Sequence, residues 1–229
     1  MIEANDLCVM FHHDIVFRWC LFFVFIHFSV VGLAQYSWDV KDPNDFNFID
    51  FGDNKLIGYN LIGLGLALLL DDDSPGNRSV ERSLSAGFIR EYDREPLSTL
   101  LFLEGRIGKP IRNYLIVGGG GRFYATRGAD LNTVGFGGFA WFTWRFLHSG
   151  SWSIGYTNGV GPNVFFSAFP SGGTNFNFTT HYGIEVERKI GSRWLNLQLI
   201  NWHISNADIK GRDRNPALDG IGIQVGVRF

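Results

Sequence analysis

Apolar and polar residues alternate with a period of two along most of this chain after residue 80. In segment 175–188, even positions from Phe176 to Val186 are mainly aromatic or aliphatic, and odd positions from Asn177 to Glu187 are mainly polar. This alternation is typical of a strand with one apolar and one polar face. We predict eight such strands, separated by Gly, Asn, Asp and Pro: 81–92, 97–107, 113–125, 133–147, 152–166, 175–188, 193–206 and 219–229.

The length of these segments and the composition of their polar faces favour a membrane barrel over a soluble sandwich. They hold about ten to fifteen residues, whereas strands of soluble proteins typically have about 5–6. Several charged residues occupy the polar faces, which a membrane barrel turns towards its lumen: Glu104, Arg106, Arg122, Arg145, Glu185 and Glu187. Aromatic residues near the segment ends match the interface girdles of such barrels.

The connections between the predicted strands alternate in length, apart from a short one at 93–96. Short periplasmic turns and longer outer loops are the usual asymmetry of outer-membrane barrels. Lipid offers no hydrogen-bond partner to a strand edge, so the sheet must close on itself. We therefore predict an all-β fold over 81–229: an eight-stranded antiparallel transmembrane β-barrel of the bacterial outer membrane.

The region before the barrel contains two apolar stretches of different character. Residues 19–33 form an apolar run that follows Arg18 and ends in small residues up to Ala34. This order is typical of a secretory signal peptide, and the run is shorter than the ~20 residues of a spanning helix. We expect a signal peptide over 1–34, with Met1 or Met10 as its start. Residues 35–80 are predicted to form an N-terminal extension, although their apolar, Gly-rich part would also fit a ninth strand or a short helix.

Removal of the leader changes the charge and the thiol content of the chain. The whole chain carries a formal net charge of −2, and the leader holds three acidic residues and one basic residue, so the mature protein is neutral. A neutral chain gives no reason to expect a nucleic-acid partner. Both cysteines, Cys8 and Cys20, belong to the leader. We therefore expect no disulfide and no cysteine-bound metal.

Three residues with the chemistry of ester hydrolysis converge near the end of the chain. In segment 193–206, His203 and Ser205 share the odd-numbered face with three leucines, and this face is predicted to look towards lipid. Asp219 occupies the corresponding face of the next strand, which a hairpin places alongside. A neutral histidine can take the proton of a serine hydroxyl, and a carboxylate can orient the imidazole. Two other acids of the intervening loop, Asp208 and Asp213, are alternatives for the third role.

An esterase of this kind also needs hydrogen-bond donors for the oxyanion of its tetrahedral intermediate. Asn206, or the backbone N–H groups that follow Ser205, are the candidates at this position. No metal or organic cofactor is needed for the scheme.

The stretch His203-Ile204-Ser205-Asn206-Ala207, followed by a loop and an acid at Asp219, resembles the lipid A 3-O-deacylases, which are acyloxyacyl hydrolase-like enzymes of Gram-negative outer membranes. The resemblance implies an eight-stranded barrel with a serine–histidine–acid triad on its lipid-facing exterior. By position His203 is the base, Ser205 the nucleophile and Asp219 the orienting acid, where the family usually has Glu. The implied substrate is the ester-linked acyl chain at the 3-position of lipid A, within the lipopolysaccharide of the outer leaflet and among other outer-membrane lipids.

Two other functions remain open at this point: a non-enzymatic structural or adhesion barrel, and a barrel esterase that acts on phospholipid or another acyl ester. The chain ends on Phe229 at the end of an apolar face, which is similar to the signal read by the outer-membrane assembly machinery. His181, near Glu185 and Glu187, fits either a metal site or, as we favour, a hydrogen-bonded network inside the lumen. Gly118–Gly121 indicates close packing in a narrow barrel rather than a phosphate loop.

Overall fold

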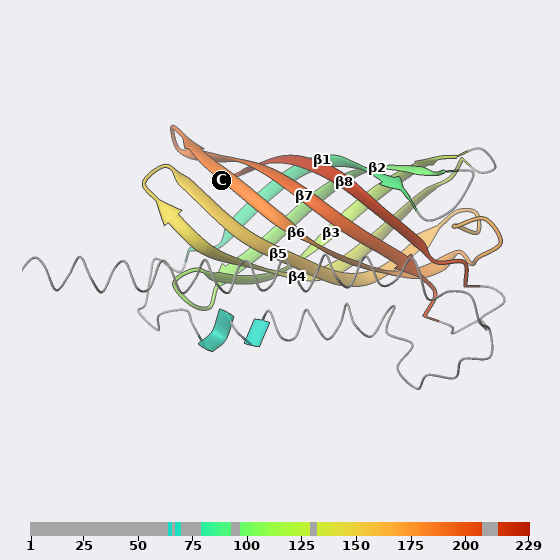
Figure 1. The fold of residues 1–229 in the computed structure, drawn as a ribbon, viewed down its shortest axis with the longest axis horizontal. Coiled ribbons are helices and arrows are strands. Elements are labelled where there is room, and N and C mark those ends of the chain that lie inside the picture. The colour runs from blue at the N-terminus through green and yellow to red at the C-terminus, as the bar shows by residue number, and fades with distance from the viewer. Residues whose placement is uncertain (1–63, 66, 70–78, 93–96, 129–131, 208–214) are drawn as a thin grey trace, which may run out of the picture. The chain divides into compact units, whose positions relative to one another are not determined.

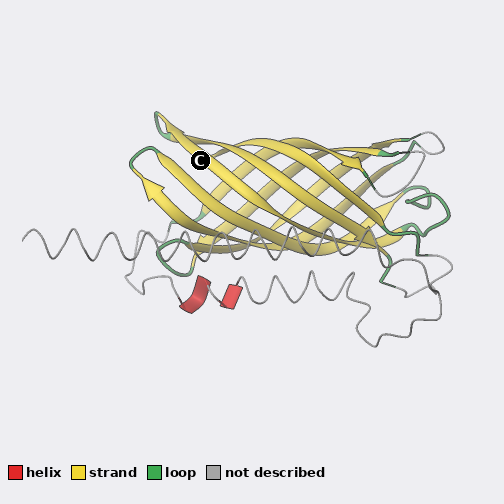
Figure 2. Ribbon diagram, in the orientation of Figure 1, coloured by secondary structure: helices red, strands yellow, loops and turns green. Residues whose placement is uncertain are grey.

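The structure is a computed structural model, which describes residues 64–65, 67–69, 79–92, 97–128, 132–207 and 215–229 (Figure 1). The expected signal peptide and most of the expected extension at 35–80 lie outside the described residues. Residues 64–65 and 67–69 are helical (Figure 2). Among the described residues, no helix has the length and hydropathy needed to cross a bilayer.

Eight antiparallel strands form one closed barrel in which each strand pairs with its neighbours in the sequence and β1 also pairs with β8 (Figure 1). The strands are β1 (Glu81–Glu91), β2 (Thr99–Pro110), β3 (Leu115–Arg127), β4 (Val134–Ser149), β5 (Trp152–Phe165), β6 (Phe176–Ile190), β7 (Arg193–Ser205) and β8 (Leu218–Arg228). The predicted eight-stranded barrel is confirmed, and the predicted bounds differ from the observed ones by three residues at most.

The two ends of the barrel differ in the length of their connections. One end carries the turns 111–114, 150–151 and 191–192, and we call it the inner end. Gly150 and Gly191 have positive φ values of 56° and 61°, which two-residue hairpin turns require. The opposite, outer end carries the connections 92–98, 128–133, 166–175 and 206–217. The first of these is longer than the sequence indicated, because β2 begins at Thr99.

Charged side chains fill the lumen from its middle to the inner end, as their positions on the polar faces predicted. Near the middle, Glu104 accepts hydrogen bonds from both Arg106 and Arg122. The Arg122 guanidinium lies 3.8 Å from the ring centre of Phe139 and 4.3 Å from that of Trp202. The interior is thus packed by ion pairs and aromatic rings, as an eight-stranded barrel is just wide enough to hold side chains.

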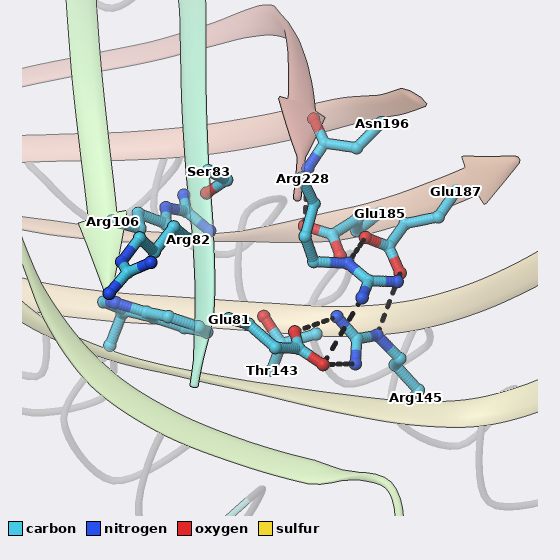
Figure 3. A pocket seen from close by; sticks show the side chains of 11 residues that line it. Glu81, Arg82, Ser83, Arg106, Thr143, Arg145, Glu185, Glu187, Asn196 and Arg228 are labelled. Atoms are coloured by element: carbon cyan, nitrogen blue, oxygen red, sulfur yellow. Dashed lines mark hydrogen bonds and ion pairs between the residues drawn. The ribbon is translucent and has the colours of Figure 1, made fainter. Parts of the chain in front are cut away.

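A second ion-pair cluster lies at the inner end of the lumen (Figure 3). Arg145 donates to Glu81 at 2.7 Å and to Glu187 at 2.9 Å. Arg228 donates to the same Glu187 at 2.7 Å. This cluster joins β1, β4, β6 and β8, so it connects opposite sides of the barrel wall.

The outer half of the lumen contains a large apolar cluster, which the sequence pattern did not predict. Ten buried side chains form this cluster: Ile89, Leu100, Phe102, Tyr124, Phe165, Phe169, Ile200, Trp202, Ile204 and Leu218. They come from both ends of the sequence and meet only when the sheet closes. The strands at the outer end therefore pack against a buried apolar cluster.

The glycine run in β3 gives the lumen room for large rings. A side chain at Gly120 would overlap the Phe139 ring, and the Gly105 carbonyl oxygen lies only 2.7 Å from where a Cβ would stand. The close packing predicted for Gly118–Gly121 is therefore confirmed at this position.

We expect Glu104→Gln to destabilise the barrel, because it leaves two buried guanidinium groups without their shared carboxylate. Loss of one member of a buried ion pair typically costs about 3–5 kcal/mol. Urea unfolding of the purified barrel in detergent micelles measures the change in the free energy of unfolding. Lys109→Gln, on the exposed face of the same strand, is the control and should change stability by less than about 0.5 kcal/mol. Equal unfolding midpoints for the two variants would contradict the structural role of the Glu104 pair.

Candidate active site

His203 of β7 and Asp219 of β8 are directly opposite each other in the strand register. Side chains at such positions have Cβ atoms about 4.5–5.5 Å apart, so even the short aspartate side chain can reach the imidazole. His203 Nδ1 lies 2.9 Å from Asp219 Oδ1. With its proton on Nδ1, the imidazole donates to the carboxylate and leaves Nε2 as the basic nitrogen.

Ser205 is the last residue of β7 and shares the face of His203. Same-face residues two apart in a strand are separated by about 6.7 Å at the backbone, a span that two side chains can bridge. The backbone N–H of Ala207 donates to Ser205 Oγ at 3.4 Å. Ala207 has a φ of 53°, which is uncommon outside glycine. This left-handed residue follows the strand after Asn206, and its N–H group points back to the serine oxygen.

The two backbone N–H groups that follow Ser205 have different surroundings. The Asn206 N–H donates to Asn215 Oδ1 at 2.7 Å, and the Asn206 side chain is itself buried. The Ala207 N–H faces the serine oxygen instead. Asn206 and the backbone N–H groups after Ser205 were the candidates for the oxyanion donor, and of these the Ala207 N–H is the one that contacts the serine oxygen. Asn215 belongs to the connection 206–217, where no periodic pattern marks it, so the sequence could not show that it reaches this site.

Side chains alternate between the two faces of β7 up to its outer end, but the outward-facing side chains are exposed only in its inner part. Leu195, Leu197 and Leu199 are 43–56% exposed and alternate with buried residues. His203 and Ser205 continue the leucine series, yet they are only 5% and 3% exposed. Asp219 precedes the exposed Ile221 on β8 and is 7% exposed. The three side chains thus share the alternating face with exposed apolar residues but are themselves covered.

The inward-facing residues of the same strand segment anchor it to the lumen. Trp202 stacks on His181 with a centroid distance of 5.3 Å, and it lies 5.0 Å from the Phe102 ring. His181 contacts the Arg122 guanidinium at 2.9 Å, which confirms the lumen-network interpretation of this histidine. In the part of the chain that the structure describes, no three His, Cys, Asp or Glu side chains gather as a metal site would require. The backbone that carries His203 is therefore held by packing on its opposite face.

The three acids considered for the third role are placed differently. Asp219 lies within the described residues and touches His203. Asp208 and Asp213 lie outside the described residues. The contact between Asp219 and His203 arises from strand register, because both residues belong to β-strands and not to the loop between them.

The sequence model of the family described as lipid A 3-O-deacylase (PagL) matches residues 108–228, slightly more than half of the chain. The chain belongs to the lipid A 3-O-deacylase family. The resemblance drawn from residues 203–219 is thereby confirmed, and this deacylase is a carboxylic ester hydrolase. Its family and its closed barrel place it in the outer membrane of a Gram-negative bacterium.

Solved structures of outer-membrane proteins are also similar to this deacylase. The crystal structure of the outer membrane enzyme PagL has 15% sequence identity and a TM-score of 0.49, covering 63% of this chain and 97% of that chain. The crystal structure of Neisserial surface protein A has 12% identity and a TM-score of 0.49, covering 67% of this chain and 98% of that chain. A comparison with curated protein sequences found no significant match.

Proposed function

We propose that this deacylase removes the acyl chain ester-linked to the 3-position of lipid A with Ser205 as nucleophile, His203 as base and Asp219 as orienting acid. One observation carries the proposal: His203 and Asp219 face each other in register with 2.9 Å between Nδ1 and Oδ1, and Ser205 follows on the same strand face. A hydroxyl, an imidazole and a carboxylate in this order are the groups that nucleophilic ester hydrolysis needs.

The first half of the reaction forms an acyl-enzyme. His203 Nε2 takes the Ser205 proton as Oγ attacks the ester carbonyl carbon, and Asp219 stabilises the imidazolium that results. The carbonyl oxygen becomes an oxyanion, for which the Ala207 N–H, already directed at Ser205 Oγ, is a suitable donor. The intermediate collapses as the bond to the sugar oxygen breaks, and the imidazolium returns its proton to that oxygen.

The second half of the reaction restores the enzyme. Water attacks the acyl-serine carbonyl while His203 accepts a proton from the water, and the bond between Oγ and the acyl carbon then breaks. Ser205 regains a proton from the imidazolium, and the fatty acid leaves. Burial of the three side chains supports this scheme, because charge interactions act more strongly in a site from which bulk water is excluded.

The substrate approaches from the lipid side of the wall. Support comes from the strand faces, since His203 and Ser205 continue the exposed series Leu195–Leu199, and Asp219 precedes the exposed Ile221. The outer end also carries the longer connections, as the extracellular end of such barrels does. A lipid A molecule that diffuses in the outer leaflet can thus present its ester at the level of Ser205.

Two features of the chain termini complete the proposal. Residues 1–34 direct the chain to export as a signal peptide, supported by the order of Arg18, an apolar run and small residues. The outer-membrane assembly machinery recognises Phe229, whose side chain is exposed and whose backbone pairs with Arg82 of β1.

Ser205→Ala should abolish deacylation, because alanine has no nucleophile. Expression of the native protein in a Gram-negative outer membrane should reduce the mass of extracted lipid A by one acyl chain, and the variant should leave the mass unchanged. Mass spectrometry of the lipid A measures this difference. Ser192→Ala, in the exposed turn between β6 and β7, is the matched control and should behave as the native protein. Cleavage of phospholipids with an unchanged lipid A mass would instead show a phospholipid esterase.

Asp219→Asn should lower kcat by about 10²–10⁴-fold, because the amide keeps the shape of the side chain but no longer stabilises the imidazolium or selects its tautomer. Deacylation of purified lipid A in detergent micelles gives kcat and KM for the folded variant. Asp208→Asn and Asp213→Asn are the controls and should retain most of the native rate. A large loss of rate in either control, with Asp219→Asn close to native, would transfer the acid role to the loop.

A further inference from the structure

Two arginine side chains flank a threonine on the outward-facing side of the wall, at the outer end of the barrel. Arg90 of β1 is opposite Thr99 of β2 in the register, and Thr99 is opposite Arg127 of β3. Both arginines are exposed, and each belongs to the face that carries exposed apolar residues on its strand, such as Phe88 and Phe123. Neighbouring strands lie about 4.8 Å apart, so the two arginine backbones are about 10 Å from each other. We call these three residues the arginine row.

The charges of the arginine row are not neutralised by the described part of the protein. The Arg90 Nη1 group donates to Thr99 Oγ1 at 2.8 Å, which directs this guanidinium towards β2 and Arg127. Among the described residues, the other exposed arginines lie near the inner ends of their strands: Arg82, Arg188 and Arg193. No described carboxylate pairs with Arg90 or Arg127. Two guanidinium groups that no described carboxylate binds suit the oxygen atoms of a phosphate, which they can bind in a bidentate manner.

The arginine row lies at the boundary of the apolar wall. Phe88 precedes Arg90 by two residues, Leu101 follows Thr99 by two, and both are about half exposed, at 45% and 53%. A row of cations directly beyond the exposed apolar band is at the level where lipid hydrocarbon gives way to head groups. Long arginine side chains reach from such a boundary to anionic head groups.

The arginine row is adjacent to the candidate active site. Arg90 is opposite Ile221 of β8, and Asp219 is two residues further along the same face. From the strand spacing and rise, the Arg90 and Asp219 backbones are about 8 Å apart. The Asn201 side chain of β7 also reaches across β8 to donate to the Tyr92 hydroxyl at 3.4 Å. The same wall face of β1, β8 and β7 thus carries both the arginine row and the buried triad side chains.

We propose that Arg90 and Arg127, with Thr99 between them, bind a phosphate group of the lipid A head group and so position the substrate with its acyl ester at Ser205. This inference rests on the proposed function, whose substrate is a phosphorylated glycolipid. The arginines act in substrate binding and not in the bond-breaking steps, so their loss raises KM more than it lowers kcat.

The test compares phosphorylated lipid A with chemically dephosphorylated lipid A in detergent micelles. The double variant Arg90→Ala with Arg127→Ala should raise KM for phosphorylated lipid A by about 10–100-fold, the scale of a few lost charge-assisted hydrogen bonds. It should leave kcat/KM for the dephosphorylated substrate unchanged, and the native enzyme should already use that substrate poorly. The double lysine variant should recover part of the affinity. Arg193→Ala, exposed at the inner end of β7, is the matched control. An equal loss on both substrates, or no loss on either, would overturn the proposal.

A binding measurement separates failure of this inference from failure of the proposed function. Ser205→Ala, with and without the two arginine substitutions, is titrated with each lipid A form, with phosphatidylglycerol micelles and with inorganic phosphate. A preference for phosphorylated lipid A that disappears in the arginine variant supports the inference even if no deacylation is observed. Deacylation that needs Ser205, together with binding that ignores the phosphate, overturns the inference alone. Arginine-dependent binding of phosphatidylglycerol or inorganic phosphate as tight as that of lipid A would also overturn it, because the site would then not recognise this substrate.

Discussion

Closure of the hydrogen-bonded sheet is the constraint on which the rest of this structure depends. Backbone groups inside a lipid bilayer have no water to bond, so every strand must have two neighbours. The pairing of β1 with β8 supplies the last of these neighbours and leaves no open edge. Because register and side-chain alternation follow from this ladder, closure also determines which residues meet on each face of the wall.

Closure creates a narrow lumen, which ion pairs and apolar side chains fill in different parts. Ion pairs around Glu104 and Arg145 occupy the middle and the inner end. An apolar cluster with Trp202 at its centre occupies the outer half. Trp202 belongs to both environments, since it packs among the apolar residues and also against the Arg122 guanidinium. The interior therefore holds β7 rigid at the point where its other face carries His203, and rigid elements position catalytic groups better than loops do.

Strand geometry sets the positions of the residues in the candidate active site. Register places Asp219 opposite His203, and alternation places Ser205 on the same face, so the proposed triad needs only two adjacent strands. The left-handed Ala207 ends this regular geometry and turns a backbone donor towards the serine. Beside these groups, the arginine row adds positive charge to the outward-facing side of the wall. One wall thus combines groups suited to breaking an ester with groups suited to holding a phosphorylated lipid.

Local periodicity determined the strands, because a period of two is written into consecutive residues and needs no distant partner. Segment length and the charged polar faces indicated the membrane setting, and the residue types of 203–219 indicated the chemistry. The tertiary structure alone decided three other features. It brought Asn215 to Asn206, it covered the His203, Ser205 and Asp219 side chains, and it filled the outer lumen with an apolar cluster from six strands and a loop. These features depend on how loops fold back and on how side chains from separate strands share one volume. Alternation along a single strand indicates the face on which a side chain lies. It does not indicate which other residues cover that side chain.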